Sequence, residues 1–275
     1  MNITPLIAAV IVSLSGFGLS GLGLTGLDSK LLTDSDPPAQ QERVVDRAIA
    51  LDGIDDFVTV PACEAMRYPG EGGWTLELWV KPVIYPHKHD VTIVGQESVG
   101  IDARDPWTLR AHPTHFQFRV DDDHGARDSI RFDMALGVWQ HVACVYEHTD
   151  VQGQQERWIA VYINGNLIER KRTAIEMGSR LDPVYMGALG KTRFCGLLDD
   201  VRVWSRGMSQ SEVSGAHLGD RVLPLQDLRA WWTFDESSGS VALNSASEEA
   251  HAVLGRPHDA HDSSAPKRIA RADQP

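Results

Sequence analysis

The 275-residue chain is poor in basic residues, and this shortage restricts its partners. Its 26 Lys and Arg are outnumbered by 38 Asp and Glu, which gives a formal net charge of −12 at pH 7. Nucleic-acid binding draws on clustered Lys and Arg that displace counterions, and no basic stripe is present here. We therefore expect no nucleic-acid partner.

Cysteine is also scarce. Cys63, Cys144 and Cys195 are too few and too scattered for a disulfide framework, and no two of them have the Cys-x-x-Cys spacing of a zinc or redox site. We expect free thiols, with Cys144 packed as a small hydrophobic side chain in a strand.

The chain lacks a Gly-x-Ser-x-Gly sequence, which removes the simplest hydrolase interpretation, and it shows no convincing long amphipathic helix in its folded part. What it has instead are short alternating segments separated by turns. In the segment 74–80, the period of two places Trp74, Leu76 and Leu78 on one face of a strand. Many short strands of this kind indicate an all-β sandwich.

Two local patterns predict particular structures. Asn164-Gly165 lies between two apolar runs, which predicts a β-hairpin closed by a type I′ turn. Ser209, followed three residues later by Glu212, has the spacing of a capping box and predicts a brief helix over 209–218.

The N-terminal segment is of another kind. From Asn2 to Leu27 it carries no charged side chain, so it is long enough to cross a bilayer as a helix. It resembles a signal peptide but lacks an opening Lys or Arg and a convincing Ala-x-Ala site. We predict a signal peptide or membrane anchor over 1–27 and a flexible linker over 28–47, which is rich in Asp, Ser, Pro and Gln.

The order of several motifs resembles a known family. The motifs are Ala50–Val60, Trp74–Pro82, Gly137–Ala143, Val161–Gly165, and Gly196–Arg206 followed by Met208–Val213. Together they resemble successive landmarks of the LamG-like jelly-roll domain of the concanavalin A-like lectin and glucanase superfamily. The resemblance implies a two-sheet antiparallel jelly-roll sandwich, which in this family binds mainly saccharides or proteins, in some cases with calcium.

The segment Trp231–Ser240 resembles a further landmark of the family, one that usually precedes the first motif. Here it comes last. It either closes the sandwich by returning beside the first strand or begins a second, incomplete repeat. We predict the first arrangement, with the jelly-roll domain over 48–255 and a disordered tail over 256–275.

An acidic turn precedes the first predicted strand pair. Asp52, Asp55 and Asp56 form either a well-made corner or part of a calcium site, since calcium takes six to eight oxygen ligands. If the last strand returns beside the first, the predicted calcium ligands become Asp52, Asp55, Asp56, Asp235, Glu236 and Asn244. No linear Asp-x-Asp-x-Asp-Gly loop is present, so the corner remains an alternative.

Aromatic side chains are the second class of candidate site residues, because sugar rings stack on aromatic surfaces. The candidates for ligand binding are Trp79, Trp107, Trp158 and Trp204. Packing in the core is the alternative for each of them.

A glycosidase needs two carboxylates in one site, and the related glucanases carry them on one strand as Glu-x-Asp-x-x-Glu. No such motif occurs in this chain: Glu77 lies alone on its strand, and Asp199 and Asp200 alternate to opposite faces. We therefore expect a binding protein that is not an enzyme.

The sequence thus favours an extracytoplasmic binding module, secreted or held at a membrane by its N-terminal segment. Loops at the rim of the sandwich would recognise a glycan or a cell-surface or matrix protein. A structural or adhesive domain without a small ligand is the first alternative, and a glycoside hydrolase is the second. The oligomeric state is left open.

Overall fold

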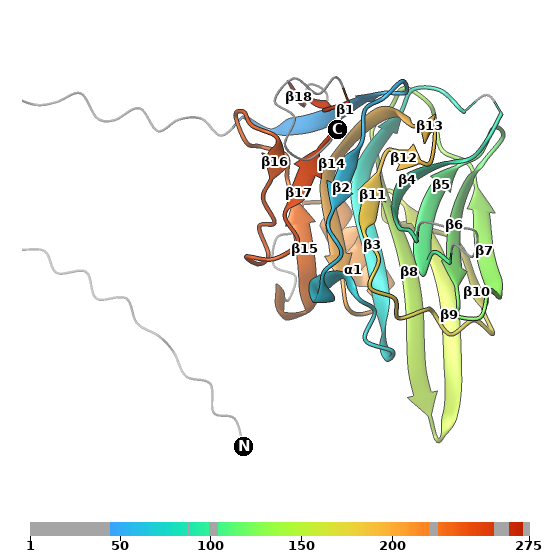
Figure 1. The fold of residues 1–275 in the computed structure, drawn as a ribbon. Helices are drawn as coiled ribbons and strands as arrows, with labels where there is room; N and C mark the ends of the chain where they lie inside the picture. Colours follow the sequence, from blue (N-terminus) through green and yellow to red (C-terminus); the bar gives the residue numbers. More distant parts are fainter. Residues whose placement is uncertain (1–44, 87, 99–103, 220–224, 256–263, 272–275) are drawn as a thin grey trace, which may run out of the picture. The chain divides into compact units, whose positions relative to one another are not determined.

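The computed structural model describes residues 45–86, 88–98, 104–219, 225–255 and 264–271. In these residues two antiparallel sheets of eight strands each lie face to face (Figure 1). The all-β two-sheet jelly-roll sandwich expected from the family resemblance is confirmed.

We name the sheets A and B. Sheet A contains, in spatial order, β10 (Asn166–Arg172), β9 (Gln154–Ile163), β8 (Gln140–Val151), β3 (Gly72–Pro82), β14 (Cys195–Trp204), β1 (Arg47–Asp52) and β18 (Lys267–Ala270), and β15 (Leu228–Trp232) also pairs with β14. Sheet B contains β16 (Val241–Ala242), β17 (Ala252–Leu254), β2 (Val58–Val60), β11 (Val184–Met186), β4 (Val91–Gln96), β5 (Trp107–Ala111), β6 (Phe116–Asp121) and β7 (Arg127–Phe132). The remaining elements are the short pair β12 (Ala188–Leu189) and β13 (Thr192–Arg193), the helix α1 (Gln210–His217), and the 3₁₀ turns η1 (Glu64–Met66) and η2 (Leu225–Asp227).

The main core lies between the sheets, because alternate side chains of each strand point inward. In β3, Trp74, Leu76 and Leu78 are buried in this core, as the period-two pattern predicts. Cys144 of β8 lies opposite Leu76 and is buried, and all three cysteines are free. The predictions of free thiols and of a packed Cys144 are therefore confirmed.

A second, smaller core covers the outer face of sheet A. Side chains of β8 and β9 that point away from the main core pack beneath α1, so sheet A is buried on both faces here. Members of this core are Ala143, Val145, Ala160, Tyr162, Trp204, Met208, Val213, Ala216 and Leu228. The predicted capping box of α1 is present, with Ser209 accepting from the Glu212 N–H and Glu212 accepting from the Ser209 N–H.

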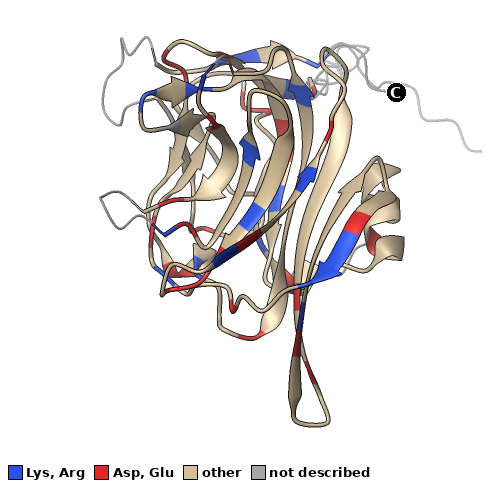
Figure 2. Ribbon diagram, turned by 90° about the vertical axis from the view of Figure 1, so that its right-hand side faces the viewer, with Lys and Arg blue, Asp and Glu red and all other residues tan. Residues whose placement is uncertain are grey.

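Two hairpins in sheet A close with the same kind of turn. Asn164 and Gly165 have φ values of 51° and 76°, which confirms the predicted type I′ turn between β9 and β10. Gln152 and Gly153 have φ values of 57° and 82° in the turn between β8 and β9. This second hairpin projects beyond the rest of the sandwich (Figures 1 and 2).

The C-terminal region departs from two predictions. β15 pairs with β14 and not with β1, whereas β18 takes the place beside β1. Lys267–Ala270 are therefore part of sheet A, and the prediction of a disordered tail over 256–275 is wrong for this strand. The second-repeat alternative is also wrong, since the strands after residue 227 complete the two sheets.

At the other end, β1 begins at Arg47, one residue inside the predicted linker. The predicted signal peptide or membrane anchor over 1–27, with its expected helix, lies outside the described residues. Among the residues that are described, no helix has the length and apolar character needed to span a membrane.

The two matched turns give a test of how closely α1 packs on sheet A. A Cβ at Gly165 would lie 3.2 Å from the Ser214 Cα atom in α1, whereas a Cβ at Gly153 would meet nothing within 4 Å. Both Gly→Ala changes carry the cost of a left-handed residue, roughly 1–2 kcal/mol. We expect Gly165→Ala to lower the melting temperature more than Gly153→Ala. Equal decreases would show that α1 can move away from the new methyl group without a loss of stability.

Candidate functional site

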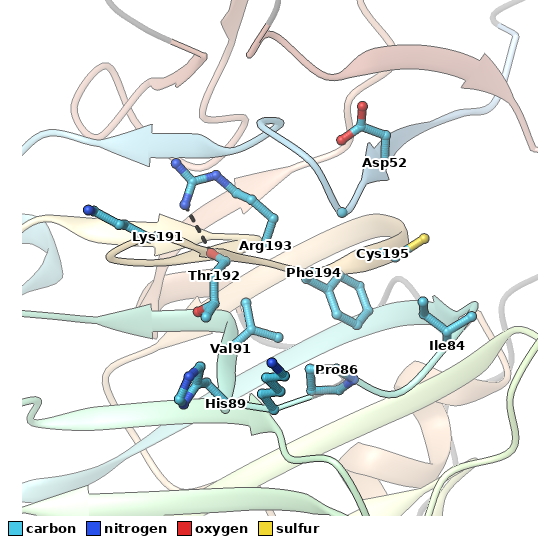
Figure 3. A pocket seen from close by; sticks show the side chains of 12 residues that line it. Asp52, Ile84, Pro86, His89, Val91, Lys191, Thr192, Arg193, Phe194 and Cys195 are labelled. Carbon is cyan, nitrogen blue, oxygen red and sulfur yellow. Dashed lines mark hydrogen bonds between the residues drawn. The ribbon is translucent and has the colours of Figure 1, made fainter.

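A cavity of about 410 Å³ opens at the end of the sandwich where three connections meet (Figure 3). It is lined from the β1–β2 connection, the β3–β4 loop, and the chain that runs from the β12–β13 turn into β14. The lining residues are Asp52, Gly53, Ile84, Pro86, Lys88, His89, Val91, Lys191, Thr192, Arg193, Phe194 and Cys195. We call this cavity the rim cavity.

Backbone contacts hold the walls of the rim cavity together. The Val83 N–H donates to the Cys195 carbonyl at 3.0 Å, which joins the β3–β4 loop to β14. Gly53 has a φ of 80°, and a Cβ on it would lie 2.9 Å from the Cys195 Cβ atom. The β1–β2 connection can approach β14 this closely because residue 53 is a glycine.

The walls combine apolar surface with polar and cationic groups. Ile84, Pro86 and Phe194 supply the apolar part, and Lys88 and Lys191 are exposed lysines at the cavity. The Arg193 guanidinium is committed to the fold, because it donates to the carbonyls of Asp55, Gly190 and Thr192.

Three of the predicted metal ligands are brought together beside this cavity. One ligand oxygen each of Asp52, Asp55 and Asp56 lies within 4.8 Å of the others, and Asp52 also lines the rim cavity. We call these residues the acidic loop. Hard carboxylate oxygens suit calcium, and the remaining positions of a coordination sphere would need water or ligand oxygens.

The acidic loop also has structural hydrogen bonds. Asp52 Oδ1 accepts from the Ile54 N–H at 2.7 Å, and Asp56 Oδ2 accepts from the Asp52 N–H at 3.0 Å. Burial raises the pKa of the Asp56 carboxyl, the hydrogen bond from Asp52 opposes this, and the charges of Asp52 and Asp55 raise the pKa further. Keeping the Asp56 carboxyl ionised in the folded protein therefore costs free energy, and a bound cation would reduce that cost.

The other three predicted ligands lie elsewhere, so the six-residue calcium site is corrected. Asp235 Oδ1 accepts from the N–H of Arg47, at the start of β1, while Asp52 ends that strand. Glu236 pairs with Arg268 at 3.2 Å. Asn244 is buried, and its side chain binds backbone groups around β15. Within the described residues, the group of close ligand atoms contains the acidic loop and none of these three.

The four tryptophan candidates divide into two pairs. Trp107 and Trp204 are 0% exposed, in the main and the second core respectively, so the prediction that they contact a ligand is wrong. Trp107 points between the sheets. Trp204 lies under α1 and donates its Nε1–H to Glu77 at 3.1 Å.

Trp79 and Trp158 are partly exposed, but cationic side chains already cover them. The Arg271 guanidinium lies 4.7 Å from the ring centroid of Trp79, and the Arg170 guanidinium lies 4.0 Å from that of Trp158. A sugar could stack on either ring only by displacing an arginine. The aromatic candidates therefore do not form one binding surface, and none of them lines the rim cavity.

The sequence analysis missed the rim-cavity residues Lys88, Lys191 and Thr192. Their one local signal is position, because Lys88 and Lys191 lie in short connections between strands and Thr192 begins the short strand β13. The three connections are far apart along the chain, and only the pairing of β1, β3 and β14 brings them to one end of sheet A. No spacing rule in the sequence shows that convergence.

A buried ionic cluster on sheet B was also missed. Asp105 Oδ2 accepts from both Arg110 and Arg119 at 2.6 Å, and burial raises the pKa of Glu97, 3.8 Å from Arg110, to about 7. One protonated and one ionised carboxyl would suit a glycosidase. However, Asp105 is held by two guanidinium groups, and such a stabilised anion is a poor nucleophile.

The fold and the rim site define a class of protein, a jelly-roll sandwich with a loop-lined cavity at one end. A family model described as the concanavalin A-like lectin/glucanases superfamily matches residues 52–214, more than half of the chain. The chain belongs to this superfamily. No curated protein sequence matches it.

Solved structures resemble the chain at low sequence identity. One is described as a "putative carbohydrate binding protein" from Bacteroides ovatus ATCC 8483, with a TM-score of 0.57 and 16% identity, covering 82% of this chain and 60% of that one. Another is the botulinum neurotoxin type G receptor binding domain, with a TM-score of 0.43 and 14% identity, covering 62% of this chain and 46% of that one. The chain thus spans less than two thirds of either structure.

The raised pKa of Asp56 predicts how pH acts on the acidic loop. A carboxyl whose folded-state pKa lies above its unfolded value costs stability as pH rises through that interval, starting near 3.8. Asp56→Asn keeps an oxygen that accepts from Asp52 but removes the charge. In EDTA we expect the variant to be more stable than the wild type at pH 7, by about 1 kcal/mol or less, and to lose this advantage at pH 3.

Melting temperatures at both pH values check this expectation. Asp122→Asn serves as a control of opposite sign: burial raises the pKa of Asp122 in the β6–β7 turn, but hydrogen bonds from His124 and Ala126 lower it overall, so this variant should be less stable than the wild type at pH 7. A stabilisation of the Asp56→Asn variant that persists at pH 3 would contradict the electrostatic explanation.

Proposed function

We propose that this chain is a non-catalytic binding module that recognises a glycan in the rim cavity. The observation that carries the proposal is the cavity itself, whose volume of about 410 Å³ falls within the usual range for ligand sites. Its mixed lining suits a sugar, which presents apolar ring faces and polar hydroxyl groups. Ile84 and Phe194 offer the apolar contacts, and Lys191 and Thr192 border the same space.

We further propose that calcium assists binding. The acidic loop would hold the ion through Asp52, Asp55 and Asp56, and Asp52 lines the rim cavity as well. A calcium ion there would neutralise the charges that raise the pKa of Asp56 and would leave coordination positions open to ligand oxygens. The likeness to the structure described as a "putative carbohydrate binding protein" from Bacteroides ovatus ATCC 8483 supports the fold on which this proposal rests.

We propose an extracytoplasmic location for the protein as part of the same hypothesis. An extracytoplasmic protein, secreted or anchored by residues 1–27, would present the rim cavity to glycans of a cell surface or matrix. A surface protein as the ligand is the alternative within this class. An adhesive domain that uses a sheet face, with no small ligand, is the next alternative.

A glycan array with the full chain, in calcium and in EDTA, tests the proposal. We expect binding in calcium that weakens in EDTA. Silence in both buffers would contradict glycan recognition and favour a protein ligand, whereas turnover of any oligosaccharide would contradict the non-catalytic assignment.

Two lysine variants locate the site. We expect Lys191→Ala to weaken glycan binding about tenfold or more, because a hydrogen bond from a charged donor contributes roughly 1.5–3 kcal/mol. The control is Lys171→Ala, which removes a cation on β10, away from the residues that line the rim cavity. Equal affinities of the two variants would exclude the rim cavity as the binding site.

A further inference from the structure

The last described segment, residues 264–271, lies along the edge of sheet A like a bound peptide. β18 forms an antiparallel pair with β1, next to it at the upper edge in Figure 1. The ends of the segment are also tied by the backbone. The Phe57 N–H donates to the Ser264 carbonyl at 3.2 Å, and the Arg271 N–H donates to the Asp46 carbonyl at 2.9 Å.

Apolar burial explains only the start of this segment, where Pro266 is buried and Ala265 packs against the main core. In the strand itself, the large apolar side chain of Ile269 is 38% exposed. Two arginine side chains are buried instead, since those of Arg268 and Arg271 are 7% and 0% exposed. Charged side chains are rarely buried without dedicated partners, so the sandwich must supply a site for each guanidinium.

Arg271 occupies a slot on the outer face of sheet A. Its guanidinium carbon lies 4.7 Å from the ring centroid of Trp79 and 4.6 Å from that of Trp139, and one nitrogen donates to the buried Asp199 carboxylate at 2.5 Å. Two aromatic rings and one carboxylate recognise the planar guanidinium in a way that an ammonium group would not match.

Arg268 occupies a second site, beside β16. It donates to the Glu236 carboxylate at 3.2 Å, to the Gly239 carbonyl at 2.6 Å and to the Val241 carbonyl at 2.7 Å. These acceptors come from the chain that follows β15 and from the first residue of β16. The guanidinium therefore joins the edge of sheet A to the neighbouring edge of sheet B.

The spacing of the two arginines matches the geometry of a strand. Successive side chains point to opposite faces, so residues three apart lie on opposite sides of the sheet. Arg268 is paired with Ile49, whose side chain lies in the main core, and Arg271 reaches the outer face. A segment with arginines two residues apart would place both on one face and would fill only one of the two sites.

We propose that the edge of β1, with these two guanidinium sites, is a binding site for an extended polypeptide segment that carries arginines three residues apart. The chain's own residues 264–271 fill the site intramolecularly, so an external segment must compete with them. The paired residues Arg47–Ala50 and the groups that hold the two guanidiniums do not line the rim cavity, and the proposal does not depend on glycan binding.

The test opens the site in the full chain. Arg268→Ala/Arg271→Ala removes both anchors, and a fluorescent peptide with the sequence of residues 264–271 is then titrated by anisotropy. We expect saturable binding to the double variant and at least about tenfold weaker binding to the wild type, whose own segment is present at a high effective concentration.

A matched control peptide has the same composition but exchanges its last two residues, which places the arginines two positions apart. We expect it to bind the double variant at least about tenfold more weakly than the native-order peptide. Equal affinity for the two peptides, equal affinity of the wild type and the variant, or no binding to a folded variant would each overturn the proposal.

A second measurement covers the case in which the double variant does not fold. The wild-type chain is incubated with excess peptide that carries a photoreactive group at the position of Ile269, and cross-links are mapped by mass spectrometry. Cross-links to β1, where Ala48 is the register partner of Ile269, are expected. Cross-links elsewhere, or none at all, would refute the site.

Discussion

The arrangement of the C-terminal half depends on an irregularity in the middle of β14. The register of β14 with β3 shifts between Asp199 and Arg202, and Asp200 has a φ of 48°. On its other side, β14 pairs with β1 before this point and with β15 after it. β1 and β15 therefore both pair along the same side of β14, one on each side of this irregularity.

The two aspartates at this irregularity then connect the strands that they separate. Asp200 Oδ1 accepts from the Trp231 Nε1–H of β15 at 2.7 Å. Asp199 accepts from the Asp200 N–H and from Arg271, the residue after β18. Burial and the Asp200 charge raise the pKa of Asp199, and Arg271 opposes this. In a regular strand, Asp199 and Asp200 would point to opposite faces of the sheet. Because β14 is irregular at this point, Asp200 binds Trp231 of β15 and Asp199 binds Arg271, the residue after β18.

Features set by neighbours in the sequence could be predicted, whereas features set by distant contacts could not. The Asn164-Gly165 turn and the helix capped by Ser209 are specified within a few residues, and the structure contains both. The burial of Trp204 depends on α1 and Glu77, and that of Trp107 on the opposite sheet, so no local pattern separates them from the partly exposed Trp79. The rim cavity depends in the same way on three distant connections, and Arg271 fell in a segment whose polar composition suggested disorder.

The acidic loop carries more negative charge than its structural hydrogen bonds require. The hydrogen bonds that Asp52 and Asp56 accept each need one oxygen acceptor, and the side-chain amide of Asn would supply it equally well. Burial and, to a smaller extent, the charges of Asp52 and Asp55 raise the pKa of Asp56, so the ionised carboxyl disfavours the folded loop at neutral pH. Across the same opening, Lys88 and Lys191 provide positive charge, so the rim cavity has an acidic and a basic side. We propose that this charge separation serves what the rim cavity binds, which would place calcium and ligand in one site.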